Sequence, residues 1–214
     1  LFSLPPGAGL IPDWITPAQD ASLAAFLDAG EWSGELRRRV RHFGYRYDYR
    51  ARSATRDSRI GPLPETLQGL AERMVAEGLF AAVPDQVIAN EYLPGQGISA
   101  HVDCEPCFGA VIVSLSLLSA CEMMFRQPDA DQHLAVRLQP RALLVLAGDA
   151  RSGWTHEIPA RRSDRVDGLA SRVDGRRDRG GLGRFAVPRG DRFGQPEHPI
   201  RRAGYGLGMA VPPR

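Results

Sequence analysis

The chain has 214 residues, with 27 basic and 25 acidic side chains, a formal net charge of +2 and a sequence pI of about 8.6. This length fits one domain with a sizeable core, and so weak a basic balance does not establish a nucleic-acid partner. The chain contains no lysine, so all 27 basic residues are arginine. Arginine suits phosphate and carboxylate recognition, although a GC-rich coding sequence produces the same bias.

The cysteines are few and odd in number, which argues against a secreted disulfide scaffold. Cys104 and Cys107 form a CxxC, which without a second pair is weak evidence for zinc or redox chemistry. No run of about 18 apolar residues and no signal-peptide pattern occurs. We therefore expect a soluble, cytoplasmic protein without membrane contact, and we take it to be a monomer.

Two segments in the first half predict helices. Thr16 can cap the first helix, Pro17 fits its first turn and Gly30 can end it. The second helix runs from Pro64 to Gly78. We expect both helices to support a sheet through apolar faces formed by Leu23, Phe26 and Leu27 in the first, and by Leu67, Leu70, Ala71, Met74 and Val75 in the second.

An arm rich in arginine and tyrosine separates these helices, at residues 37–50. From Gly44 to Arg50 the residues Tyr45, Tyr47 and Tyr49 alternate with charged residues, which is typical of a β-strand or a hairpin arm. Aromatic rings can stack on bases while arginines contact phosphates, as in many single-strand binders. An edge strand with a buried tyrosine face explains the pattern equally well.

From about residue 85 the pattern becomes β-rich. We predict strands near residues 86–93, 98–103, 110–118, 121–127, 133–138 and 141–147. Val111 to Leu118 is apolar except for Ser114 and Ser116, as expected for a strand buried between two sheets. The predicted fold class is mainly β with flanking helices (α+β), a double-stranded β-helix or jelly-roll barrel with a site at one mouth.

The composition changes after about Ile158, where arginine, glycine and proline dominate without periodicity. Such a bias is typical of disorder, and only Gly183 to Pro188 resembles a strand. We therefore divide the chain into a domain of residues 1–164 and an atypical Arg/Gly-rich tail of residues 165–214.

Two histidines and one aspartate form the most informative pattern of the chain. In an extended strand, residues two apart point the same way, so His101 and Asp103 are expected to aim at one point. His156 follows another apolar strand. Two imidazoles and one carboxylate with open positions form the facial triad of non-haem Fe(II) oxygenases. Taken singly, these residues also fit a turn histidine, a capping aspartate and a core histidine.

The surroundings of this pattern resemble the AlkB family of Fe(II)/2-oxoglutarate oxygenases, in particular the domain that accompanies some tRNA-modifying methyltransferases. The resemblance rests on Asn90 and Tyr92, the Pro-Gly-Gln-Gly turn, the serine-containing strand, and Trp154 two residues before His156. It covers roughly residues 10–164. It implies that His101, Asp103 and His156 bind Fe(II), and that Asn90 and Tyr92 contact the cosubstrate 2-oxoglutarate.

The resemblance also implies an enzyme, a dioxygenase that uses O2 and 2-oxoglutarate to demethylate or hydroxylate modified bases in DNA or RNA. Tyr45 and Tyr47 fall in the segment that forms the family's nucleotide-recognition lid, and Glu105 falls where relatives often place an acidic base-contacting residue. A protein demethylase or hydroxylase is a rival within the enzyme class, because this fold hosts many substrates.

One family feature is absent from the sequence. Relatives follow the second histidine with two arginines six positions apart, the first of which clamps 2-oxoglutarate, and no such pair occurs from Arg161 to Arg214. Arg172 and Arg177 stand at a plausible distance after His156, as do Arg176 and Arg179. The sequence does not decide which of these arginines, if any, binds 2-oxoglutarate. We consider two explanations: a tail outside the natural reading frame, or a non-catalytic metal-binding module that holds nucleic acid but has lost the cosubstrate.

Overall fold

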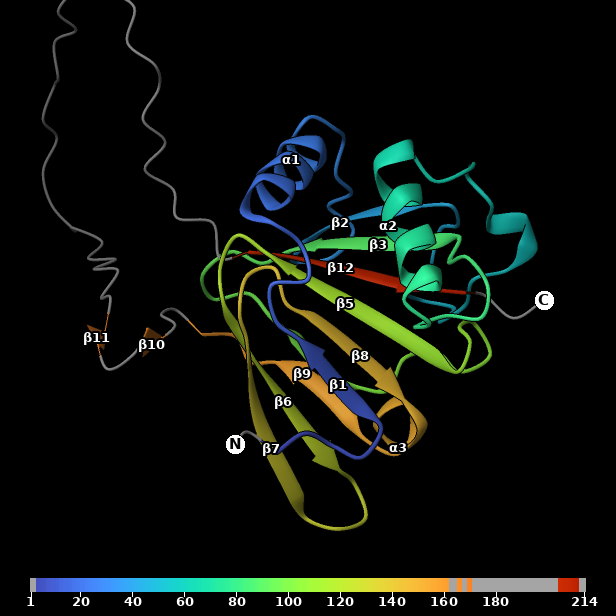
Figure 1. Cartoon of the computed structure of the whole chain (residues 1–214). Helices are drawn as coiled ribbons and strands as arrows, with labels where there is room; N and C mark the ends of the chain where they lie inside the picture. The colour runs from blue at the N-terminus through green and yellow to red at the C-terminus, as the bar shows by residue number, and fades with distance from the viewer. Residues whose placement is uncertain (1–2, 162–164, 167–168, 171–203, 212–214) are drawn as a thin grey trace, which may run out of the picture.

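The computed structural model describes residues 3–161, 165–166, 169–170 and 204–211, which form two antiparallel sheets packed face to face, with helices outside (Figure 1). The larger sheet contains, in order across it, β1 (Ala8–Ile11), β8 (Leu143–Ala147), β5 (Val111–Leu117), β12 (Tyr205–Ala210), β3 (Gln86–Glu91) and β2 (Arg39–Phe43). The smaller sheet contains β4 (Ile98–His101), β9 (Thr155–Ile158), β6 (Cys121–Gln127) and β7 (Gln132–Leu138). Two short strands, β10 (Arg165–Val166) and β11 (Leu169–Ala170), pair with each other.

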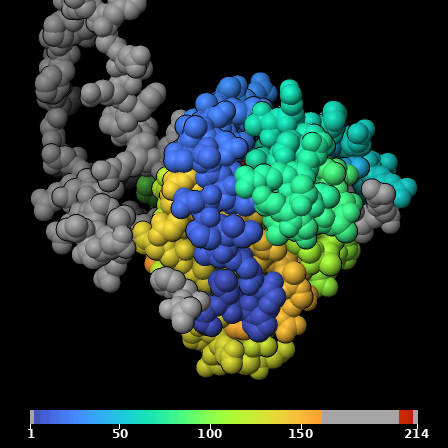
Figure 2. All heavy atoms as spheres, in the orientation of Figure 1, coloured from blue at the N-terminus to red at the C-terminus, as the bar shows by residue number. Residues whose placement is uncertain are grey.

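Two helices cover the outer face of the larger sheet. The first, α1 (Pro17–Asp28), begins where the sequence predicts, because the Thr16 hydroxyl accepts from the backbone N–H of Gln19 in a capping box. The second, α2 (Glu65–Ala76), packs with α1 into one apolar cluster over β3, β5 and β12. Figure 2 shows both helices side by side on this face of the molecule. None of the described helices is long and apolar enough to span a membrane.

A second apolar cluster lies between the two sheets. Phe125 of β6, which is fully buried, contributes to it from the smaller sheet, and Leu144 of β8 contributes from the larger one. Trp154 closes the cluster after the short helix α3 (Gly148–Ser152). This sandwich of two antiparallel sheets with helices outside confirms the predicted fold class. All six predicted strands occur within two residues of their expected bounds.

The sequence does not predict three strands of the larger sheet, β1, β2 and β12, and β12 is the one in its interior. It pairs with β3 on one side and with β5 on the other, and its Leu207 and Met209 are buried. The boundary drawn at residue 164 therefore separates this strand from the sheet to which it belongs. The strand suggested for Gly183 to Pro188 lies outside the described residues, as does most of the tail.

The tyrosine-rich arm is not a continuous strand. After β2 it is held by two isolated bridges to the residues that follow it, between Tyr45 and Arg59 and between Asp48 and Ser53, and a 3-10 turn, η1 (Arg56–Ser58), lies between these two partners. The predicted alternation is nevertheless visible in the burial, since the tyrosines are half-buried whereas the charged residues between them are exposed. The arm is therefore an irregular hairpin beside the entrance between the sheets.

Candidate metal centre and its cavity

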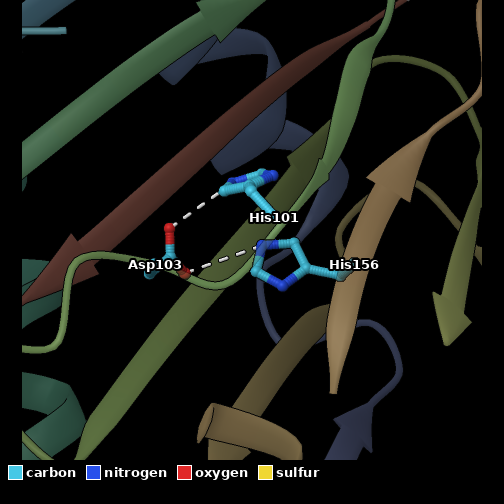
Figure 3. Close-up of side chains that lie close together, drawn as sticks. All are labelled: His101, Asp103 and His156. Carbon is cyan, nitrogen blue, oxygen red and sulfur yellow. Dashed lines mark ion pairs between the residues drawn. The ribbon is translucent and has the colours of Figure 1, made fainter. Parts of the chain in front are cut away.

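His101, Asp103 and His156 lie together, as the sequence predicts (Figure 3). His101 ends β4, His156 lies in β9, and the two are paired across the smaller sheet. Their Nε2 atoms each lie 3.6 Å from one oxygen of the Asp103 carboxylate. The three side chains therefore converge on one point from two adjacent strands and the segment that follows β4.

The Pro-Gly-Gln-Gly turn holds β4 and β9 in this register. The backbone N–H of Gly95 donates to the Arg161 carbonyl over 2.7 Å, just beyond β9. Gly97 lies so close to the backbone of Ile158 and Ala160 that a Cβ at this position would overlap the Ile158 carbonyl. Only glycine permits this close approach of the two backbones. The glycine of the turn therefore allows β4, which carries His101, to lie against β9.

The protonation of the three groups suits a cation. Nδ1 of His101 lies 2.8 Å from the Ser99 carbonyl oxygen and donates to it, which leaves Nε2 as the ring nitrogen that faces Asp103. Burial lowers the pKa of His156 to about 4, although the charge of Asp103 acts in the opposite direction, so this ring is neutral at pH 7. Burial acts to raise the pKa of Asp103, but the nearby His101, His156 and Arg151 lower it overall.

Histidine nitrogens and carboxylate oxygens bind first-row metals at about 2.0–2.2 Å, so ligands at right angles stand about 3 Å apart. The spacings of 3.6 Å are close to this value, and all three ligand atoms lie within 4.8 Å of one another. Burial acts to lower the pKa of His101, but contact with Asp103 raises it overall, because the carboxylate stabilises a positive charge beside it. The residues present therefore fit a metal ion of the Fe(II) type.

The triad opens onto a cavity of about 660 Å³ between the two sheets. Asn90 of β3 and Tyr92, which follows it, line this cavity, as do Ser114 and Ser116 of β5. Burial raises the pKa of Tyr92 above its ordinary range, so its hydroxyl is a proton donor at any physiological pH. The structure thus brings Asn90 and Tyr92 to the same chamber as the triad.

Of the three residues proposed to contact a base, one lines the cavity and two do not. Tyr47 lines the cavity and stacks on Phe108, with ring centroids 5.7 Å apart, and the ring of Tyr49 meets Tyr47 edge-on. Tyr45 and Glu105 are not among the lining residues, and Glu105 is exposed. Of the residues named from the sequence, Tyr47 therefore has the position that a base-stacking ring requires.

Several lining or supporting residues were not identified from the sequence. Arg151 of α3, only 5% exposed, donates to backbone carbonyls of the segment that follows the triad aspartate. Gln86 of β3 is buried against the cavity, with its Oε1 bonded to no described residue. Arg38 also lines the cavity. No sequence signal marks these residues, because arginine is common throughout the chain and Gln86 belongs to no motif.

Two further expectations concern cysteines and arginines. Cys104 and Cys107 form a disulfide directly after Asp103, with Cα atoms 5.2 Å apart. No group of three or more potential metal ligands other than the triad occurs in the described part of the chain. Arg172 and Arg177, named as candidates for the cosubstrate clamp, lie outside the described residues.

Comparison with known proteins agrees with this geometry. The model of the 2OG-Fe(II) oxygenase superfamily matches residues 7–179. The chain belongs to this superfamily. Over 194 residues it is 35% identical to the alkylated DNA repair protein ALKBH8 homolog of Arabidopsis thaliana, which covers 80% of the chain. Over 174 residues, or 78% of the chain, it is 36% identical to the tRNA (carboxymethyluridine(34)-5-O)-methyltransferase ALKBH8 of Mus musculus. These relatives place the chain in the AlkB family.

The match to the relatives is partial in length. It spans 56% of the length of the Arabidopsis protein and 26% of the length of the mouse protein. A solved structure titled OsALKBH1 superposes with a TM-score of 0.64 over 98% of both chains at 17% identity, which supports the jelly-roll fold. This AlkB-family chain is thus a 2-oxoglutarate-dependent dioxygenase, a class that uses Fe(II), 2-oxoglutarate and O2.

Proposed function

We propose that this dioxygenase oxidises alkylated or otherwise modified bases in nucleic acid, with His101, Asp103 and His156 as its iron ligands. The observation that carries the proposal is the position of Tyr47, whose ring lies in the wall of the same cavity that contains the triad. A base extruded from its strand can stack on an aromatic ring while a C–H bond of its substituent faces the metal.

The roles of the chain's own residues follow from their protonation. His156, which is neutral, and His101 present their Nε2 atoms, and Asp103 presents a carboxylate, which together would leave open positions on one side of an ion. Fe(II), 2-oxoglutarate and O2, when bound, would supply the hydroxylation of a C–H bond, in which one oxygen atom of O2 enters the product and the other enters succinate as CO2 is lost. Asn90 and Tyr92 face the same chamber and provide hydrogen-bond donors to the cosubstrate.

The basic arm supports a polyanionic substrate. Arg46 and Arg50 of the arm are exposed, and Arg52, also exposed, lines the cavity next to Tyr47. Exposed arginines contact phosphates without reading sequence, while a stacked ring holds one base. The names of the relatives refer to DNA repair in one case and to tRNA in the other. Both polymers are therefore candidates.

The test uses the full chain with Fe(II) and 2-oxoglutarate. It is incubated with single-stranded DNA and RNA oligonucleotides carrying N-methylated bases and, in parallel, with an N-methylated peptide. We expect succinate release coupled to loss or hydroxylation of the base modification, measured by mass spectrometry, and none of it with His101→Ala. Turnover of the peptide and not of any oligonucleotide contradicts the proposal in favour of a protein demethylase or hydroxylase.

A second candidate function is a metal-binding module that holds nucleic acid without catalysis. One specific observation favours it: β12 places no charged side chain among the residues that line the cavity, so this strand supplies no clamp for a carboxylate. Anaerobic addition of 2-oxoglutarate to the Fe(II)-loaded chain separates the two candidates. The visible absorbance of the chelate supports the enzyme, whereas metal binding without this band supports the module.

A further inference from the structure

The central strand β12 offers no charged side chain to the cavity. The lining residues of β12 and of the position before it include no charged side chain, and every second one is glycine or alanine: Gly204, Tyr205, Gly206, Gly208, Met209 and Ala210. Gly206 is paired with Asn90 on one side and with Ser116 on the other, so the floor of the cavity between these polar side chains is bare backbone. A dicarboxylate bound here needs a cation from another element, because a buried carboxylate without a partner is strongly unfavourable.

Arg38 brings a guanidinium to this part of the cavity. It directly precedes the edge strand β2, is half-buried and lines the cavity. Its Nε donates to Oδ1 of Asn90 over 2.8 Å, and the guanidinium carbon lies 6.0 Å from the ring centroid of Tyr49. Its two terminal nitrogens donate to no described side chain or carbonyl. They are therefore available for a ligand.

The polar groups that line the cavity with Arg38 include several hydrogen-bond donors and one carboxylate. Because the amide oxygen of Asn90 is occupied by Arg38, the Asn90 nitrogen is the group left to face a ligand. The Tyr92 hydroxyl is protonated, since burial raises its pKa. Asp103 of the triad is the only carboxylate among the described lining residues. Donors of this kind in the wall of one cavity favour the binding of an anion.

The other lining arginine, Arg52, is placed differently. It is exposed on the arm, and its side chain interacts with the hydroxyl of Tyr47 rather than with Asn90 or Tyr92. Arg38 instead donates to Asn90 and lines the same cavity as Tyr92 and the triad. A five-carbon dicarboxylate that chelated the metal through one end would leave its other carboxylate for a cation in the cavity wall, and Arg38 is such a cation.

We propose that Arg38, with Asn90 and Tyr92, holds the distal carboxylate of 2-oxoglutarate in this chain, a task that β12 cannot perform. A guanidinium fork matches a carboxylate through two parallel hydrogen bonds, which a lysine or glutamine cannot reproduce. The proposal deepens the assignment of the cosubstrate site and is independent of whether the substrate is nucleic acid.

The test compares two ligands with the same chelating end. 2-Oxopentanoate keeps the keto acid of 2-oxoglutarate but has a methyl group in place of the distal carboxylate. Each is titrated anaerobically into the Fe(II)-loaded chain while the visible chelate absorbance is recorded. We expect the wild-type chain to bind 2-oxoglutarate about 10- to 100-fold more tightly than 2-oxopentanoate, the preference that hydrogen bonds to a charged group confer.

In Arg38→Gln this preference is expected to fall to about one- to three-fold through weaker 2-oxoglutarate binding, with 2-oxopentanoate affinity and Fe(II) affinity unchanged. Arg38→Lys is expected to be intermediate. The matched control is Arg37→Gln, because Arg37 is the exposed neighbour and does not line the cavity. Thermal unfolding of each variant shows that the fold is intact.

Two results overturn the inference. The first is a preference that survives in Arg38→Gln, which places the distal carboxylate at Arg52 or at an arginine outside the described residues; Arg52→Gln separates these two. The second is a wild-type chain that does not distinguish the two ligands. Neither result depends on any oligonucleotide, so failure of the nucleic-acid proposal and failure of this inference are distinguishable.

Discussion

Arg151 donates a hydrogen bond of 3.1 Å to the backbone carbonyl of Asp103, which lies 48 residues earlier in the chain. The same guanidinium reaches the carbonyls of Cys104, Phe108 and Gly109 over 3.3–3.5 Å. It thus joins α3 to the whole turn that follows the triad aspartate. Asp103 is not part of a strand, so this buried side chain fixes the position of its carboxylate.

We expect Arg151→Leu to lower the free energy of unfolding by about 3 kcal/mol or more, because buried carbonyls lose a charged donor. Affinity for Co(II), a spectroscopic substitute for Fe(II), should fall about 10- to 100-fold, as for other groups that orient metal ligands. Urea unfolding and a visible-absorbance titration measure the two effects. Arg151→Lys should recover part of the metal affinity.

The exposed Arg126→Gln serves as the control and should change the free energy of unfolding by less than about 0.5 kcal/mol. Unchanged Co(II) affinity in Arg151→Leu, despite a loss of stability, contradicts a positioning role and leaves Arg151 as a structural residue.

The β-region and the triad could be predicted from the sequence because both depend on short-range patterns. Alternating or continuous apolar runs mark β3 to β8 directly. The separation of two residues between His101 and Asp103 places both on one side of an extended segment, and no long-range information is needed for that step. His156 was placed with them by resemblance, and the pairing of β4 with β9 confirms that it lies there.

The missed elements depend on long-range contacts. In β12, glycine alternates with Tyr205, Leu207 and Met209, and glycine lowers strand propensity, so the segment looks like a continuation of the Gly-rich tail. Its strand conformation comes from partners on both sides that lie far away in sequence. Arg38 and Arg151 were missed for a related reason, because nothing local distinguishes a buried arginine from the many exposed ones.

Gly44 connects β2 to the tyrosine arm with a φ of +78°, and a Cβ at this position would overlap the carbonyl of Asp85. We expect Gly44→Ala to destabilise the chain by at least about 1–2 kcal/mol, the cost of the left-handed conformation alone. The arm should also shift, since Tyr47 and Tyr49 follow this hinge. Urea unfolding gives the first effect, and the affinity for a single-stranded oligonucleotide gives the second.

The matched control for this change is Gly69→Ala in α2, where a Cβ would meet nothing within 4 Å. An alanine inside a helix should stabilise the chain by about 0.5–1 kcal/mol. If Gly44→Ala raises the free energy of unfolding, as Gly69→Ala is expected to do, the close approach of Gly44 to Asp85 does not exist in solution.

Leu207 tests whether β12 belongs to the folded domain. Its side chain is fully buried in the cluster beneath α1 and α2. We expect Leu207→Ala to lower the free energy of unfolding by about 2–5 kcal/mol, as for other large-to-small changes in a core. The exposed Ile60→Ala should change it by less than about 0.5 kcal/mol. A negligible effect of Leu207→Ala would mean that the residues after 203 do not form the central strand.

Metal binding should stabilise the chain through the triad alone. A ligand present at about 100 times its dissociation constant adds about 2.7 kcal/mol to the free energy of unfolding, provided that the unfolded chain does not bind it. We therefore expect Co(II) to raise the unfolding temperature of the wild-type chain, and to have little effect on His156→Ala or Asp103→Ala. The control is His133→Ala, because His133 is exposed on β7, and this variant should keep the full shift. Since the shift is measured within each variant, loss of stability caused by the substitution itself does not enter the comparison. A shift that persists in His156→Ala would show that the metal binds elsewhere.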